Sequence, residues 1–236
     1  GGVPFTVLTS ILALLVTSEL LRMKNIVYRS PAGIIAFLFT LIVAVPEEWL
    51  PWTKFDLSLF VLIILFCLTV ISKNRYHFDD ISFVFISSLY AGFGFYYMMM
   101  TRMLPDGLVV LLFVLLVIWS TDSGAYFVGR KIGKRKLWPE ISPNKTIEGA
   151  GGGILSAVVI ASLFQTVFPL FLFPKTVLIA VVISVFAQIG DLVESALKRH
   201  YGVKDSGHLL PGHGGILDRC DSWIFVFPIL HLFQLI

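Results

Sequence analysis

The chain has 236 residues, of which 57% are hydrophobic and only 14% charged, and its formal net charge is +3. With a mean hydropathy of +0.88, it has too few polar residues to cover the surface of a water-soluble domain of this size. The composition therefore excludes a soluble globular protein and predicts an integral membrane protein.

The apolar residues form long runs, each close to the length that crosses a bilayer. A helix needs roughly 20 apolar residues to span about 30 Å of hydrocarbon, whereas membrane strands would be shorter and would alternate. The eight predicted spans are 3–21, 31–45, 57–72, 80–100, 107–129, 147–168, 175–197 and 221–236. Because the connections are mostly short, we predict an all-α, polytopic helix bundle that forms a single membrane domain, residues 1–236.

The basic residues predict which loops face the cytoplasm. All but three of the 18 Lys and Arg residues lie in the loops 22–30, 73–79, 130–146 and 198–220. These loops alternate with poorly basic ones, so the positive-inside rule makes the four basic loops cytoplasmic. Residue 1 then lies on the outer side, without a preceding Met or basic flank, and we expect one more span before it, about nine in the full-length protein.

A carboxylate interrupts the fifth apolar run, in the segment Ser120–Tyr126. An acidic side chain inside an apolar span is costly and indicates a function. Helical spacing places Asp122, Tyr126 and Arg130 on one stripe. The alternative is a structural ion pair of Asp122 with Arg130 or with another helix.

The loop that follows carries a basic run and then the segment 142–149, Ser-Pro-Asn-Lys-Thr-Ile-Glu-Gly. A basic run beside a membrane is typical of a topogenic or headgroup-binding patch. In the second part, Pro143 and Asn144 predict a turn and Thr146 predicts a helix cap. Lys145 then lies at the positive end of the next helix, a place that suits a phosphate. The glycines from 149 to 153 favour close helix packing over ligand contact.

The densest polar region runs from residue 190 to residue 221. On a helix, Asp191, Lys198 and Arg199 fall on one stripe, and Asp218 and Asp221 share a face of the next helix. Carboxylates without His or Cys ligands suit Mg²⁺. Lys and Arg suit phosphate oxygens and a pyrophosphate leaving group. The residue types alone thus indicate metal-assisted chemistry on phosphates at the cytoplasmic surface.

A histidine, His213, stands among glycines in this region. Glycines let the backbone approach a ligand closely, which favours a binding role. The alternative is a polar structural residue.

The stretch from Ser195 to Asp221 resembles the signature of phosphatidate cytidylyltransferases, also called CDP-diacylglycerol synthases. It contains Ser-x-Leu-Lys-Arg, Lys-Asp-Ser-Gly, Leu-Pro-Gly-His-Gly-Gly and Asp-Arg-x-Asp. Segments 120–126 and 142–149 also look like segments of this family, whereas the N-terminal spans match only in number and placement.

The resemblance implies a homodimeric enzyme of the cell (plasma) membrane, with an active site that faces the cytoplasm. It would transfer CMP from CTP to phosphatidic acid among membrane lipids, giving CDP-diacylglycerol and pyrophosphate for phospholipid biosynthesis, without a nucleic-acid partner. The implied cofactor is Mg²⁺, and a second, monovalent cation such as K⁺ is left open. The catalytic part would be the C-terminal region, about 118–222.

The resemblance also implies roles by matching position. The catalytic residues would be Asp191, Lys198, Asp218 and Asp221, of which the three aspartates would bind the metal. The substrate-binding residues would be Asp122, Ser142, Lys145, Arg199, Lys204, Asp205, His213 and Arg219.

Three alternatives share some of these features. A CDP-alcohol phosphotransferase would need an Asp-Gly-x-x-Ala-Arg run, which the sequence lacks. A CTP-dependent lipid or polyprenol kinase shares the donor but would release CDP in place of pyrophosphate. An ion-coupled transporter could use Asp122 and Asp191, but the paired halves typical of transporters are missing.

Overall fold

A computed structural model describes residues 2–207 and 214–236, and within them the chain is predominantly helical. The α-helices are α1 (Val3–Met23), α2 (Pro31–Ala44), α3 (Lys54–Ile71), α4 (Phe78–Met103), α5 (Gly107–Ile132), α6 (Ile147–Val167), α7 (Phe173–His200) and α8 (Leu217–Leu232). A short 3-10 helix, η1, covers Glu47–Trp49.

Each of the eight predicted apolar runs lies largely within one of these helices, so the prediction of a helical membrane protein is confirmed. Six helices of the described chain are long and apolar enough to cross a membrane by length and composition, and α2, with 14 residues, is shorter. The number of membrane spans therefore stays a prediction.

Several helix boundaries differ by a few residues from those of the apolar runs, because polar caps, and not hydropathy, decide where a helix begins. The Ser30 hydroxyl accepts the Gly33 N–H at 3.2 Å at the start of α2. Thr53 accepts the Asp56 N–H at 3.1 Å at the start of α3. At the other end of the chain, α7 continues through charged residues to His200.

The contacts divide the chain into two compact units, each built from segments that are distant in sequence. The first comprises Gly1–Met99 with Tyr201–Arg219, and the second comprises Met100–His200 with Cys220–Ile236. The prediction of a single domain, with its catalytic part near 118–222, stays a prediction.

The first unit has an apolar core between α1, α2, α3 and α4. Phe39 stacks on Phe85 with ring centroids 5.1 Å apart, and Val43 and Leu65 are fully buried beside them. Polar contacts inside this core are side-chain hydrogen bonds between helices, such as the one between the hydroxyls of α1 and α2 at Thr17 and Thr40, 2.9 Å apart.

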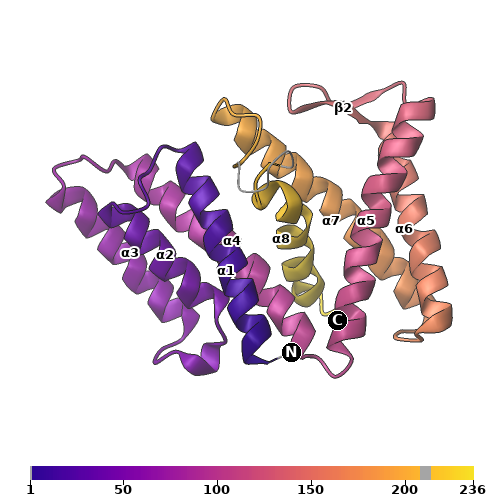
Figure 1. Ribbon diagram of the computed structural model, residues 1–236, viewed down its shortest axis with the longest axis horizontal. Helices are drawn as coiled ribbons and strands as arrows, with labels where there is room; N and C mark the ends of the chain where they lie inside the picture. The colour runs from indigo at the N-terminus through magenta and orange to yellow at the C-terminus, as the bar shows by residue number, and fades with distance from the viewer. Residues whose placement is uncertain (1, 208–213) are drawn as a thin grey trace. The chain divides into compact units, whose positions relative to one another are not determined.

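In the second unit, α5 and α6 run side by side (Figure 1) and meet through small residues. A Cβ atom at Gly152 would overlap the side chain of Val128, and one at Gly153 would lie 3.0 Å from the Thr121 carbonyl oxygen. The glycines at the start of α6 thus allow close helix packing, as predicted. Gly151 is the exception, with open space around its Cβ position.

A two-stranded antiparallel sheet connects α5 to α6, which the all-α prediction did not include. Strand β1 (Lys136–Trp138) pairs with β2 (Ser142–Thr146), with Lys136 opposite Thr146 and Trp138 opposite Ser142. The predicted turn at Pro143 and Asn144 is wrong, because both residues lie in β2 and the chain reverses at 139–141. Proline is tolerated in β2 because a strand of a two-stranded sheet is an edge strand.

Candidate active site

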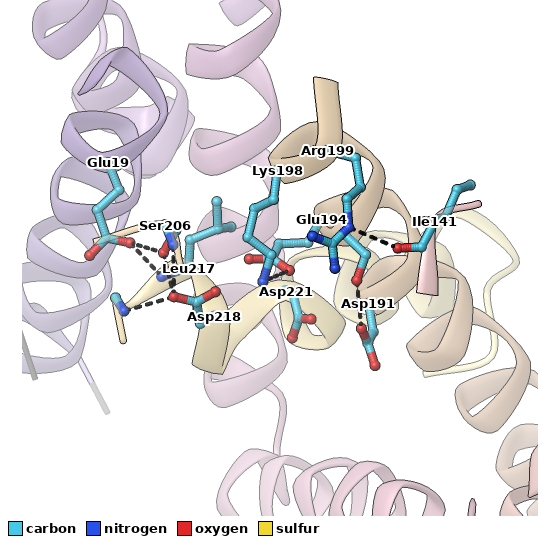
Figure 2. A network of polar contacts seen from close by, with 12 residues as sticks. Glu19, Ile141, Asp191, Glu194, Lys198, Arg199, Ser206, Leu217, Asp218 and Asp221 are labelled. Carbon is cyan, nitrogen blue, oxygen red and sulfur yellow. Dashed lines mark hydrogen bonds and ion pairs between the residues drawn. The ribbon is translucent and has the colours of Figure 1, made fainter. Parts of the chain in front are cut away.

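Three carboxylates from two helices of the second unit form an acidic group. Asp191 and Glu194 of α7 and Asp221 of α8 each offer an oxygen atom, and these atoms lie within 4.8 Å of one another. Figure 2 shows the three side chains close together. A donor set made only of carboxylate oxygens fits a hard divalent cation such as Mg²⁺.

Small residues let α7 and α8 approach closely enough to form this group. A Cβ atom at Gly190 would lie 2.9 Å from the Asp221 carbonyl oxygen and 3.0 Å from the Phe225 Cβ. The Ser222 hydroxyl donates to the Ala187 carbonyl oxygen at 3.2 Å. Asp191 and Asp221 are direct neighbours of these contact residues in sequence, so the helix contact draws their carboxylates together.

Two lysines compensate the negative charge of the acidic group. Lys145 Nζ, on β2, lies 2.5 Å from Asp191 Oδ2. Lys198 Nζ lies 2.6 Å from Glu194 Oε2, one helical turn away on α7, and the Glu194 side chain is only 2% exposed. The buried charge of Glu194 is stable because it has this partner.

A cavity of about 430 Å³ lies beside Asp191 in the second unit. It lies within the usual range of small-ligand sites, about 300–1,000 Å³. Its charged and amide side chains come from α5, the hairpin and α7, and they are Asp122, Arg130, Asn144, Lys145, Gln188 and Asp191. The cavity therefore combines carboxylates with cations, as a phosphate substrate with a metal would require.

The predicted stripe on α5 is confirmed, since Asp122, Tyr126 and Arg130 all line this cavity. Arg130 Nη1 donates to the Tyr126 hydroxyl at 3.2 Å. The guanidinium of Arg130 thus contacts the phenol, one turn away, on the same stripe that carries Asp122.

The hairpin that carries Lys145 is fastened at both ends. The Thr146 hydroxyl accepts the Gly149 N–H at 3.1 Å, which confirms the predicted cap of α6. Arg199 Nε, at the end of α7, donates to the Ile141 carbonyl oxygen at 3.3 Å, next to the half-buried Ser142. The predicted residues Ser142 and Lys145 therefore lie on the hairpin, and the predicted residue Arg199 contacts it.

The remaining described residues among the predicted ones lie in the first unit, in or next to the segment between α7 and α8. We call the described part of this segment, residues 201–207 and 214–216, the signature loop. Lys204 and Asp205 are exposed in this loop, and Arg219 is exposed in the first turn of α8. His213 lies outside the described residues.

Asp218 contacts the signature loop through its carboxylate oxygen Oδ2. Its Oδ2 accepts the Gly215 N–H at 2.8 Å and the Ser206 N–H at 2.9 Å, and the Ser206 Oγ lies 2.9 Å away. The acidic group consists of Asp191 and Asp221 together with Glu194, and a metal-binding role for Asp218 stays a prediction.

Sequence reasoning missed two carboxylates. Glu194 lies three residues after Asp191 and four before Lys198, so the helical spacing that marked the polar stripe also marked this residue. Glu19 is a buried acidic residue within the apolar run of α1. The rule that singled out Asp122 in its span applies equally to Glu19.

Comparison with known proteins identifies the family of this chain. Residues 1–236 match the Cytidylyltransferase family. A phosphatidate cytidylyltransferase of Bacillus subtilis is 48% identical over 98% of this chain and 88% of its own length. Proteins of the same name from Staphylococcus saprophyticus and Staphylococcus epidermidis are 47% and 45% identical, over 98% of this chain and 90% of theirs. The signature at Ser195–Asp221 thus identified the relatives correctly, and the chain belongs to the cytidylyltransferase family.

Proposed function

We propose that this protein transfers a cytidylyl group from CTP to phosphatidic acid, giving CDP-diacylglycerol and pyrophosphate for phospholipid biosynthesis. The observation that carries the proposal is the match of nearly the whole chain to relatives named phosphatidate cytidylyltransferase at 45–48% identity. The acidic group and the cationic residues beside a cavity support the same chemistry.

The phosphate of phosphatidic acid is already an anionic nucleophile, so it needs alignment more than deprotonation. One of its oxygens attacks the α-phosphorus of CTP in line, a new P–O bond forms, and the bond to pyrophosphate breaks. Two anions must approach each other, and the side chains of Lys145 and Lys198 reduce their repulsion. Lys145 would exchange its contact with Asp191 for a phosphate oxygen when the substrates bind.

Asp191, Glu194 and Asp221 would hold Mg²⁺, since all three offer carboxylate oxygens within 4.8 Å of one another. When bound, the ion supplies charge neutralisation for the phosphate oxygens and the leaving pyrophosphate. A second, monovalent cation such as K⁺ is part of the proposal, and titrating K⁺ against Na⁺ at fixed Mg²⁺ tests it by the change in rate.

The acyl chains of the lipid substrate stay in the bilayer, so the site belongs at a membrane surface. We assign it to the cytoplasmic side of the cell membrane, because the hairpin and the loop after α7 carry basic residues. The family resemblance further suggests a homodimer, and cross-linking in native membranes at two protein densities would test it.

The direct test of the activity uses purified protein in mixed vesicles with phosphatidic acid, Mg²⁺ and CTP labelled in the cytosine and in the γ-phosphate. We expect the cytosine label in the lipid and the γ label in pyrophosphate. Release of CDP with the γ label in the lipid would instead identify a CTP-dependent lipid kinase.

A further inference from the structure

A buried carboxylate on α1, outside the signature, contacts the signature loop directly. Glu19 is 6% exposed in the middle of an apolar unit. Among the described residues, its carboxylate forms no ion pair with a Lys, Arg or His side chain within 4.0 Å. A carboxylate in such a place is costly unless hydrogen bonds satisfy it. The hydrogen bonds of the Glu19 carboxylate therefore have to offset the cost of burying it.

Within the described part of the chain, the hydrogen bonds that the Glu19 carboxylate accepts come from the signature loop and the start of α8. Oε1 accepts the Ile216 N–H at 2.8 Å, and Oε2 accepts the Leu217 N–H at 2.8 Å. The Ser206 hydroxyl donates to Oε2, also at 2.8 Å. Figure 2 shows the Glu19 carboxylate directed toward Ser206 and Leu217.

The two backbone donors are among the N–H groups that a helix leaves unsatisfied at its first turn. Because this end of a helix is positive, an anion placed there is stabilised. Glu19 thus caps α8 from another helix, although it is nearly 200 residues away along the chain.

Two glycines of the signature make this approach possible. A Cβ atom at Gly207 would lie 2.6 Å from Glu19 Oε1, and one at Gly215 would overlap Glu19 and the Ser206 hydroxyl. Any side chain at either position would push the loop away from the carboxylate. The two glycines therefore leave the space that the Glu19 carboxylate occupies.

We propose that Glu19 is a positioning residue, whose carboxylate fixes the signature loop and the first turn of α8 in the conformation that the reaction requires. It acts through the Ser206 hydroxyl and the backbone N–H groups of Ile216 and Leu217, and not on the substrates. The kinetic part of this proposal rests on the proposed cytidylyl transfer, whereas the structural part does not.

The test compares Glu19→Gln with Glu48→Gln, an exposed glutamate of the same unit, in the full chain. Glutamine keeps the size of the side chain but turns one acceptor into an amide donor, which would face a backbone N–H. We expect faster hydrogen exchange in peptides that contain Ile216 and Leu217 for Glu19→Gln, and no change for Glu48→Gln. Unchanged exchange at these amides overturns the proposal even if the protein shows no transferase activity.

Kinetics separate positioning from a purely structural role. For Glu19→Gln we expect kcat/KM to fall by about ten-fold or more per folded molecule while the thermal midpoint stays within a few degrees. Gly215→Ala should show the same kinetic loss, because it displaces the same contact. Wild-type kinetic constants in folded Glu19→Gln, or in Gly215→Ala, would contradict the positioning role.

If Glu19→Gln does not fold, Gly207→Ala decides the question, since its added methyl group would meet the Glu19 side chain and displace the carboxylate. A several-fold fall in kcat/KM at unchanged thermal stability supports the proposal, and unaltered kinetics overturn it. An inactive wild-type protein would instead refute the proposed function. The hydrogen-exchange measurement would still test whether Glu19 orders Ile216 and Leu217.

Discussion

At the scale of single residues, the acidic group gathers three carboxylates in the space of one ion. Like charges this close repel one another, and Lys145 and Lys198 form ion pairs with Asp191 and Glu194. A divalent cation would remove the remaining repulsion and would bring substrate phosphates into the same place. We therefore expect the acidic group to bind the metal ion tightly only when the nucleotide is also present.

We expect Asp221→Asn to lower turnover by about 100-fold or more while the protein remains folded. The amide keeps the shape of the side chain but removes one negative charge from the metal site. Formation of CDP-diacylglycerol, measured over a range of Mg²⁺ concentrations, checks this. Asp106→Asn, an exposed aspartate at the start of α5, is the matched control and should behave as wild type; full activity of Asp221→Asn would refute the assignment.

Lys145 is the cation that contacts both the cavity and the acidic group. We expect Lys145→Ala to lower kcat/KM by about ten-fold or more, because the charge that faces the phosphates is lost. Lys131→Ala removes an exposed lysine at the end of α5 and should change kcat/KM less than two-fold, within about the error of such assays. Equal effects of the two substitutions would show that only overall charge matters.

At the scale of elements, the site depends on how closely helices approach. The acidic group exists because α7 and α8 touch at Gly190, and the cavity is closed by the α5 and α6 pair, which meet at glycines, and by a hairpin fastened to α7. These positions carry no reactive atoms. They affect activity only because they set the distance between the backbones of neighbouring helices.

The two glycines Gly190 and Gly151 offer a matched comparison within helices. Gly190→Ala would place a methyl group 2.9 Å from the Asp221 carbonyl oxygen, so we expect a loss of about 1–3 kcal/mol in stability and a higher Mg²⁺ requirement. Gly151→Ala meets open space and should stabilise the protein by about 0.5–1 kcal/mol. Thermal unfolding and Mg²⁺ titrations check both, and a harmless Gly190→Ala would show that α7 and α8 can separate without loss of the site.

At the scale of the whole molecule, the distribution of basic residues predicts which loops face the cytoplasm. In a background of Cys67→Ser and Cys220→Ala, a cysteine in place of Lys136 should react with a membrane-impermeant maleimide only after the cells are opened. A cysteine in place of Trp52, which is 61% exposed near the start of α3, should react on intact cells. The reverse pattern would invert the assigned topology and place the site outside the cell.

Much of this protein could be predicted from the sequence, because membrane insertion and helix formation depend on local properties. Runs of apolar residues predicted the helices, and Thr146 predicted a helix cap. The spacing of Asp122, Tyr126 and Arg130 predicted a stripe, and these residues line the cavity. The hairpin was missed, because strands of three and five residues, the second of which contains Pro143, leave no periodic pattern.

The sequence by itself determined the helical membrane class, the family and some of the residues that line the cavity, among them Asp122, Lys145 and Asp191, since these follow from composition, spacing and a long motif. Only the tertiary structure decided which carboxylates meet. It brought Glu194 together with Asp191 and Asp221, placed Asp218 in contact with the signature loop, and placed Glu19 at the start of α8. Such contacts depend on how closely two helices can approach, and that distance is a property of paired surfaces that no single segment encodes.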